Sequence, residues 1–154
     1  MAIKQNSAAK GTETIAYPSN AGEVVRNRFV FAVAAGTAIA AGDILEIGCI
    51  PANCEVVDII LDSDAIDTNG TPTLVADVGI MSGEWGDEAQ DRTCGAEFFS
   101  ASNALRAGGV ARPTLASAYR TSKSDKHRSI GIKVTTVAAT QASGTIGLTV
   151  LVAA

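Results

Sequence analysis

Two cysteines, Cys49 and Cys54, stand five positions apart between two apolar runs in "GDILEIGCIPANCEVVDIILD", residues 42–62. Thiolates at such positions can bind zinc or carry out redox chemistry. The only further soft ligands in the chain are Cys94 and His127, and a zinc site would need all four in one place. The spacing also differs from the C-x2-C pattern of zinc knuckles and thioredoxin-like sites. We therefore expect no metal site here.

The residues between the two cysteines, "IPAN", predict a tight turn. Pro51 fixes its own φ, and Asn53 tolerates turn conformations. On this interpretation each cysteine lies at a strand end as a small apolar side chain. A disulfide between Cys49 and Cys54 stays open as an alternative, because strand ends that flank a tight turn can come within bonding distance.

An acidic run, "DSDAIDTNG" at residues 62–70, offers oxygen ligands for a cation. It departs from the EF-hand calcium loop, since Ile66 stands at the fifth position and Thr73 replaces the closing glutamate at the twelfth. Two interpretations stay open: a cation site of another geometry, or a loop whose side chains cap nearby backbone groups. The side chains concerned are Asp62, Asp64, Asp67 and Asn69.

Nothing in the sequence assembles into an active site. His127 lies in the basic segment "YRTSKSDKHRS", which we interpret as an exposed loop, and no G-x-S-x-G nucleophile motif is present. Trp85, in the polar segment "SGEWGDEAQ", either packs over the end of a sandwich or anchors a partner. We predict a protein that is not an enzyme, with no catalytic residues, no cofactor and no metal.

The elements that would position these residues are strands. Apolar side chains alternate along the chain, which is typical of strands with one buried face. Expected strands follow from "RFVFAVA", "EVVDIILD", "TLVADVGIM", "RSIGIKVTTV" and "GTIGLTVLVA", with shorter candidates at "DILEIG", "TCGAEFF" and "ARPTLAS". In the second of these, Val57, Ile59 and Leu61 are predicted to face the core. The last two long strands are predicted to form a hairpin through "AATQASG".

The predicted fold is all-β: a single β-sandwich or jelly roll of about eight antiparallel strands. One short helix is predicted over "SASNALRAG", residues 100–108. Residues 1–25 show no sustained period, and we predict an extended N-terminal arm there, ordered only where it lies on something else. The predicted sandwich domain covers residues 26–154.

The composition argues against two classes of partner, nucleic acids and membranes. The chain has 154 residues and a net charge of −4, which argues against direct binding of nucleic acid. No apolar run is long enough for a spanning helix and no secretory signal is visible, so we expect synthesis in a cytoplasm and no membrane partner.

Four stretches resemble small structural proteins of tailed bacteriophages, in particular the jelly-roll capsid decoration, or cement, proteins. They are "AGDILEIGCIPANCEVVDIILDSD", "DTNGTPTLVADVGIMSG", "AEFFSAS" followed by "AGGV", and "HRSIGIKVTTVAATQASGTIGLTVLV". The resemblance covers roughly residues 28–154. The two cysteines are the clearest departure, since a glycine near Asn53 would be more usual in this family.

The resemblance implies a non-enzymatic virion protein that binds the outer capsid surface and bridges neighbouring major capsid subunits. It also implies a homodimer or homotrimer. We expect the arm to make the partner contacts through Ile3, Ile15, Tyr17 and Pro18, with Trp85 as a further anchor. Removing residues 1–20 would then leave the sandwich folded. A tail, baseplate or fibre component and a carbohydrate- or cell-surface-binding module are the alternatives.

Overall fold

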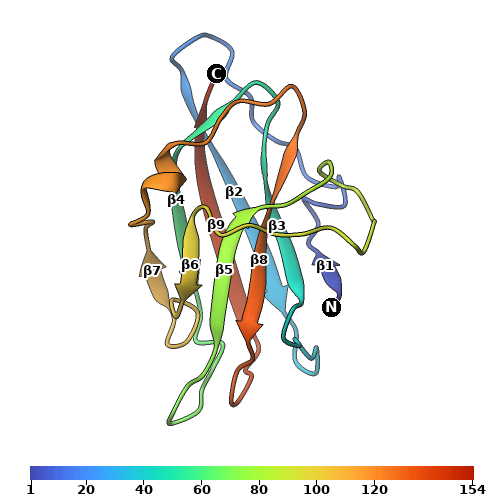
Figure 1. Ribbon diagram of the computed structural model, residues 1–154, viewed down its shortest axis with the longest axis vertical. Coiled ribbons are helices and arrows are strands. Elements are labelled where there is room, and N and C mark those ends of the chain that lie inside the picture. Colours follow the sequence, from blue (N-terminus) through green and yellow to red (C-terminus); the bar gives the residue numbers. More distant parts are fainter.

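Two β-sheets pack face to face in the computed structural model, which describes residues 1–154 (Figure 1). The structure contains nine strands and one short 3-10 helix, so the predicted all-β sandwich is confirmed. No helix has the length and apolar character needed to cross a membrane. The elements are β1 (Ile3–Gln5), β2 (Val24–Val33), β3 (Ile44–Ile50), β4 (Glu55–Ser63), β5 (Val75–Ile80), β6 (Phe99–Ser102), β7 (Gly109–Ala111), η1 (Ala116–Tyr119), β8 (Arg128–Thr136) and β9 (Gly144–Ala153).

The order of strands is that of a jelly roll. Sheet 1 has the order β1-β3-β8-β5-β6, and sheet 2 has the order β2-β9-β4-β7. Four antiparallel pairs are nested, namely β2 with β9, β3 with β8, β4 with β7 and β5 with β6. This is the pattern of one long hairpin rolled into two sheets. The ninth strand, β1, adds to the edge of sheet 1 in parallel with β3.

The core lies between the two sheets and is built from the alternating apolar positions that the sequence indicates. Phe29, Phe31 and Val33 on β2 are buried, and so are Ile130, Ile132 and Val134 on β8. Every even-numbered residue of β9 from Ile146 to Val152 is buried as well. The period of two therefore reports correctly which face of β2, β8 and β9 points inward.

Val57 departs from this pattern. It was predicted to face the core with Ile59 and Leu61, but its side chain is 41% exposed and Val56 is buried instead. The pairing of β4 with β9 shifts between Val56 and Asp58, where two positions advance on β4 for one on β9. Such a β-bulge turns the side chains that precede it onto the opposite face.

The predicted C-terminal hairpin is wrong. Residues 138–144 do connect two strands, but β8 lies in sheet 1 between β3 and β5, and β9 lies in sheet 2 between β2 and β4. The connection crosses from one sheet to the other. Alternation in β8 and β9 shows that each strand has one buried face, but it does not show which strands pair.

The helix predicted over residues 100–108 is also wrong. The first three residues of this segment, 100–102, belong to β6, which pairs with β5. The residues after Ser102 form turns. The single helical element is η1, which the sequence pattern does not indicate. A nine-residue segment gains little from helical hydrogen bonds alone, so pairing with a neighbouring strand prevails.

Part of the segment 1–25 packs on the chain's own sandwich. β1 pairs with β3, and Ala8, Ala9 and Ile15 are buried in the main core cluster or beside it. Figure 1 shows β1 beside β3, and the last part of the segment forms the loop at the top of the view that leads into β2. The first nine residues and Ile15 are thus held by contacts within the chain, whereas most of residues 10–24 is exposed.

Candidate interaction surface

Three aromatic side chains from distant parts of the chain meet at one end of the sandwich. The His127 ring lies 5.7 Å from the Tyr17 ring and 6.2 Å from the Trp85 ring, both edge-to-face. We call these three residues the Tyr17 cluster. Edge-to-face contacts are favourable because the positive ring edge meets the negative ring face. The cluster joins the N-terminal segment, the β5–β6 connection and the segment that leads into β8.

Hydrogen bonds fix the His127 ring within the Tyr17 cluster. The backbone N–H of Ala52 donates to Nδ1 of His127 at 3.1 Å. A ring nitrogen that accepts carries no proton, so the neutral ring holds its proton on Nε2 and donates to the Tyr17 hydroxyl at 2.8 Å. The backbone N–H of Trp85 also donates to the His127 carbonyl. His127, expected in an exposed loop, is therefore half-buried and ties this end of the molecule together.

The β5–β6 connection that carries Trp85 is held on the outer face of sheet 1 by a buried ion pair. Glu46 and Arg92 are 0% and 3% exposed, and Arg92 Nη1 lies 3.0 Å from Glu46 Oε2. Arg92 also donates to the Ser129 hydroxyl at 2.8 Å and to the Ser82 and Asp87 carbonyls. Buried charges are tolerated only when such partners replace water. The pair therefore holds the backbone on both sides of Trp85, at Ser82 and Asp87, against sheet 1.

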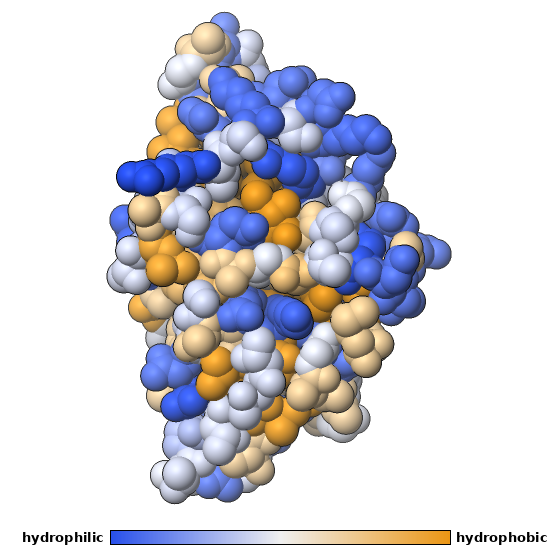
Figure 2. Space-filling view, viewed as in Figure 1, coloured by the Kyte–Doolittle hydropathy of each residue, from blue (hydrophilic) through white to orange (hydrophobic).

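A small apolar cluster lies under the same connection. Ile3, Ile44 and Met81 pack together on the outer face of sheet 1, with Cys94 beside them. Gly131 on β8 makes this approach possible, because a Cβ there would lie 2.9 Å from both Ile44 and Met81. Figure 1 shows the connection crossing in front of β8 and β5. In Figure 2 the covered face shows several small apolar patches separated by hydrophilic residues.

Asn6 closes the side of the sandwich between the two sheets. Its side-chain amide donates to the Val30 carbonyl on β2 at 3.0 Å and to the Ile47 carbonyl on β3 at 2.7 Å. Its side-chain oxygen accepts from the Ala9 N–H at 2.9 Å. One residue thus satisfies backbone groups of both sheets and of the segment that follows it, which buried polar groups require.

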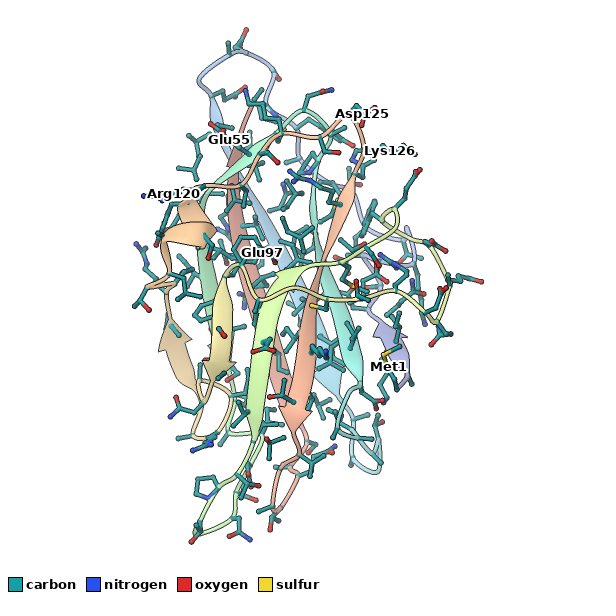
Figure 3. The ribbon with its side chains drawn as sticks, in the orientation of Figure 1. Met1, Glu55, Glu97, Arg120, Asp125 and Lys126 are labelled. Carbon is teal, nitrogen blue, oxygen red and sulfur yellow. The ribbon has the colours of Figure 1, made fainter.

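The structure brings together only part of the set predicted to contact a partner. Tyr17 is 49% exposed, Trp85 is half-buried against the core, and Pro18 is half-buried beside Tyr17 in sequence. Ile3 and Ile15 are buried within their own chain. An exposed ion pair between Lys126 and Glu84 borders the Tyr17 cluster, and Figure 3 shows Lys126 and Asp125 at this end of β8. Tyr17, Pro18 and Trp85 remain the candidates for partner contact.

The three cysteines are free thiols that point to no site chemistry. The turn predicted between Cys49 and Cys54 is present, with Asn53 at φ 60°, and it crosses from β3 in sheet 1 to β4 in sheet 2. Burial raises the pKa of Cys49 to about 12, and that of Cys94 to about 12 as well. Thiols of such high pKa stay protonated and are poor nucleophiles. No group of three or more His, Cys, Asp and Glu side chains is arranged to hold a metal ion.

The acidic run 62–70 caps backbone groups. Asp67, buried, accepts N–H bonds from Asn69, Thr73 and Leu74 and, across the gap between loops, from Ala139 and Thr140. Its carboxylate thereby joins the β4–β5 loop to the β8–β9 loop. Asp64 accepts the Thr145 N–H, and Asp62 pairs with Arg28.

This arrangement predicts a dependence of stability on pH. Burial alone would raise the pKa of Asp67, but the N–H bonds from Thr140, Ala139, Leu74 and Thr73 lower it well below its ordinary value. A group with a lowered folded-state pKa stabilises the fold above its unfolded pKa of about 4, and this stabilisation is lost as the pH falls below that value. Asp67→Asn should therefore be less stable than the wild type at pH 7, with a difference that shrinks below about pH 4. Urea unfolding from pH 7 to pH 2 measures this, and Asp91→Asn, at an exposed position, should show no such convergence.

Comparison with known proteins places this fold among phage capsid proteins. A chain of the capsid of Ralstonia phage GP4 has a TM-score of 0.94 and 44% sequence identity, and the match covers 99% of this chain and 97% of that one. A chain of the capsid asymmetric unit of cyanophage Pam1 shares the fold at a TM-score of 0.59 and 22% identity, over 93% and 94% of the two chains. No protein-family model matches the sequence, and no curated protein matches it either.

The jelly-roll sandwich and these similarities define a phage capsid-related protein with a structural role in the virion. At 44% identity over nearly the whole length of both chains, the relationship extends beyond the fold. This chain belongs to the same family as the matching chain of the Ralstonia phage GP4 capsid.

Proposed function

We propose that this protein is a non-enzymatic decoration, or cement, protein that binds the outer surface of a phage capsid and bridges neighbouring major capsid subunits. The observation that carries the proposal is the full-length match to a chain of a phage capsid. The match favours a head component over a tail, baseplate or fibre component. The protein is proposed to act as an oligomer of identical chains, assembled on the particle.

The proposed capsid contact is the exposed part of the Tyr17 cluster with Pro18. Tyrosine and tryptophan supply large contact areas with little loss of side-chain entropy, and they are enriched among the residues that dominate binding. His127 also holds the Tyr17 cluster in place through its hydrogen bonds, and Arg92 holds the backbone on both sides of Trp85. A preformed contact loses less entropy on binding than a mobile arm would.

Binding to capsids assembled without this protein tests the proposal. Purified protein is added to such capsids, bound protein is measured by co-sedimentation, and cryo-electron microscopy locates it. We expect density on the outer surface between major capsid subunits, and Tyr17→Ser should weaken binding about tenfold or more. Tyr119→Ser is the matched control, since Tyr119 is 51% exposed but lies on η1. Absence of binding, or density inside the shell or on the tail, would contradict the proposal.

A further inference from the structure

The outer faces of the two sheets differ in what covers them. The β5–β6 connection packs across the outer face of sheet 1 through Met81 and Arg92. No segment covers sheet 2 in this way, and its strands carry four of the eight large apolar side chains that are exposed. These four are Val24 and Val30 on β2, Val57 on β4 and Val110 on β7. Sheet 2 therefore presents a face of mixed apolar and charged character to the surroundings.

The charges on this face are sorted by strand. The charged outward residues of β2 are Arg26 and Arg28, whereas those of β4 are Glu55, Asp58 and Asp62. Between them, β9 contributes only uncharged outward residues, from Thr145 to Ala153. The pairing registers place Arg26 and Asp58 opposite each other across Leu151, and Val24 and Glu55 opposite each other across Ala153. The face has a basic column and an acidic column on the two sides of β9.

Contacts within the chain show that the two columns attract each other. Arg28 reaches across β9 to Asp62, with Nη2 and Oδ2 at 2.8 Å. It passes directly over Gly147, where a Cβ would lie only 2.1 Å from the guanidinium. At the outer side of the acidic column, Arg112 pairs with Asp58 at 3.1 Å. Three basic and three acidic residues thus leave this face neutral on a chain whose net charge is −4.

We propose that a second copy of this chain docks on the outer face of sheet 2, with a two-fold axis that runs along β9 in the plane of the interface. A half-turn about this axis places β2 of one copy over β4 of the other, so each basic column meets an acidic column. It also brings Val24 of one copy toward Val57 of the other. Two-fold interfaces require such self-complementary patches, and a neutral face lets two acidic chains approach without repulsion.

The size of the face indicates a weak or moderate dimer. A ten-residue strand such as β9 rises about 33 Å, and four strands span about 15 Å. The projected area is therefore about 500 Å², below the roughly 800 Å² per partner of a standard interface. The dimer is accordingly expected to depend on concentration, with dissociation in the micromolar range. This inference rests on the self-association in the proposed function and specifies the surface through which it occurs. The Tyr17 cluster then stays free to bind the capsid.

Sedimentation velocity of the full chain between 1 and about 300 µM, at low salt, tests the interface. The wild type should show a monomer–dimer equilibrium. Val57→Lys should raise the dissociation constant about tenfold or more by placing a charge in the apolar part of the contact. Val137→Lys is the matched control, since Val137 is exposed to a similar degree but lies at the β8–β9 connection, and it should leave the constant unchanged.

A charge-exchange experiment tests whether the basic column of one copy faces the acidic column of the other. Arg26→Glu and Asp58→Arg should each weaken the dimer, and the double variant should recover at least half of the lost affinity, because these two residues lie at the same level of β9 and the half-turn places one over the other. A monomeric wild type at 300 µM, or a dimer that none of these variants affects, would overturn the inference. So would variants that lose capsid binding while they dimerise normally, since the capsid would then cover this face. Capsid binding by a wild-type monomer would leave the proposed function intact.

Discussion

Replacing Arg92 with leucine is expected to lower the free energy of unfolding by about 3–5 kcal/mol, the usual cost of leaving one member of a buried ion pair without its partner. The Glu46 carboxylate would keep the Gln5 amide and the Ser129 hydroxyl as donors, but it would have no counter-charge at 0% exposure. Such a loss is a large part of the 5–15 kcal/mol of a typical domain. Urea unfolding followed by circular dichroism measures it.

Three further variants separate the effect of the buried charge from the loss of a side chain. Glu46→Leu alone should also lower the free energy of unfolding, because it leaves the Arg92 charge buried without a partner. The double variant Glu46→Leu, Arg92→Leu should be more stable than the sum of the two single effects predicts, because no charge stays buried. Arg112→Leu removes an ion pair whose arginine is 64% exposed, and it should cost no more than about 1 kcal/mol. A loss for Arg92→Leu as small as that of Arg112→Leu would contradict the role assigned to the pair.

Trp85 gives a second measurement of the same prediction. It is the only tryptophan of the chain and belongs to the connection that Arg92 holds on sheet 1. In the Arg92→Leu variant its fluorescence should shift to longer wavelength at urea concentrations below the main transition, because the connection separates from the sheet before the sandwich unfolds. The two signals should coincide in Arg112→Leu.

The sequence predicts the strands well because each long strand buries one face. Alternation locates β2, β4, β5, β8 and β9, and the Pro51–Asn53 turn is present as predicted. The choice of sheet is not encoded in alternation, which is why β8 and β9 are predicted as a hairpin although they lie in different sheets. The orientation of Val57 depends on a bulge opposite β9, so it is decided by a strand about ninety positions further along the chain.

The candidate surface was predictable only in part. Tyr17 and Trp85 are conspicuous as rare aromatic residues, but their meeting at His127 joins positions up to 110 residues apart. Glu46 could be recognised as unusual from the sequence, because it is the single carboxylate in the apolar run "ILEIGCI". Arg92 could not, because it is one of several charged residues in a polar segment. The role of Asn6 could not be predicted from the sequence, because its partners are backbone carbonyls of two strands that only the folded chain brings together.

Removing residues 1–16 is the second change with a large expected effect, and the contacts of β1 and Ile15 lead us to expect a less stable sandwich, whereas the sequence alone predicts that the sandwich stays folded without its N-terminal arm. The truncated chain would lose β1 and the buried side chains of Ile3 and Ile15. Full burial of two isoleucines contributes about 3–6 kcal/mol. We therefore expect the truncated sandwich to be destabilised by at least about 3 kcal/mol, or not to fold cooperatively. Urea unfolding and near-ultraviolet circular dichroism measure this.

Point variants keep the prediction testable if the truncated chain does not fold. Asn6→Ala should lower the free energy of unfolding by about 2 kcal/mol or more, because the Ile47 carbonyl is left buried without a donor. Lys10→Ala, at an exposed position of the same segment, should change it by less than about 0.5 kcal/mol. A truncated chain as stable as the wild type, with Asn6→Ala equal to Lys10→Ala, would show that the segment is an arm after all. It would then be available to a neighbouring subunit, as a capsid-binding arm requires.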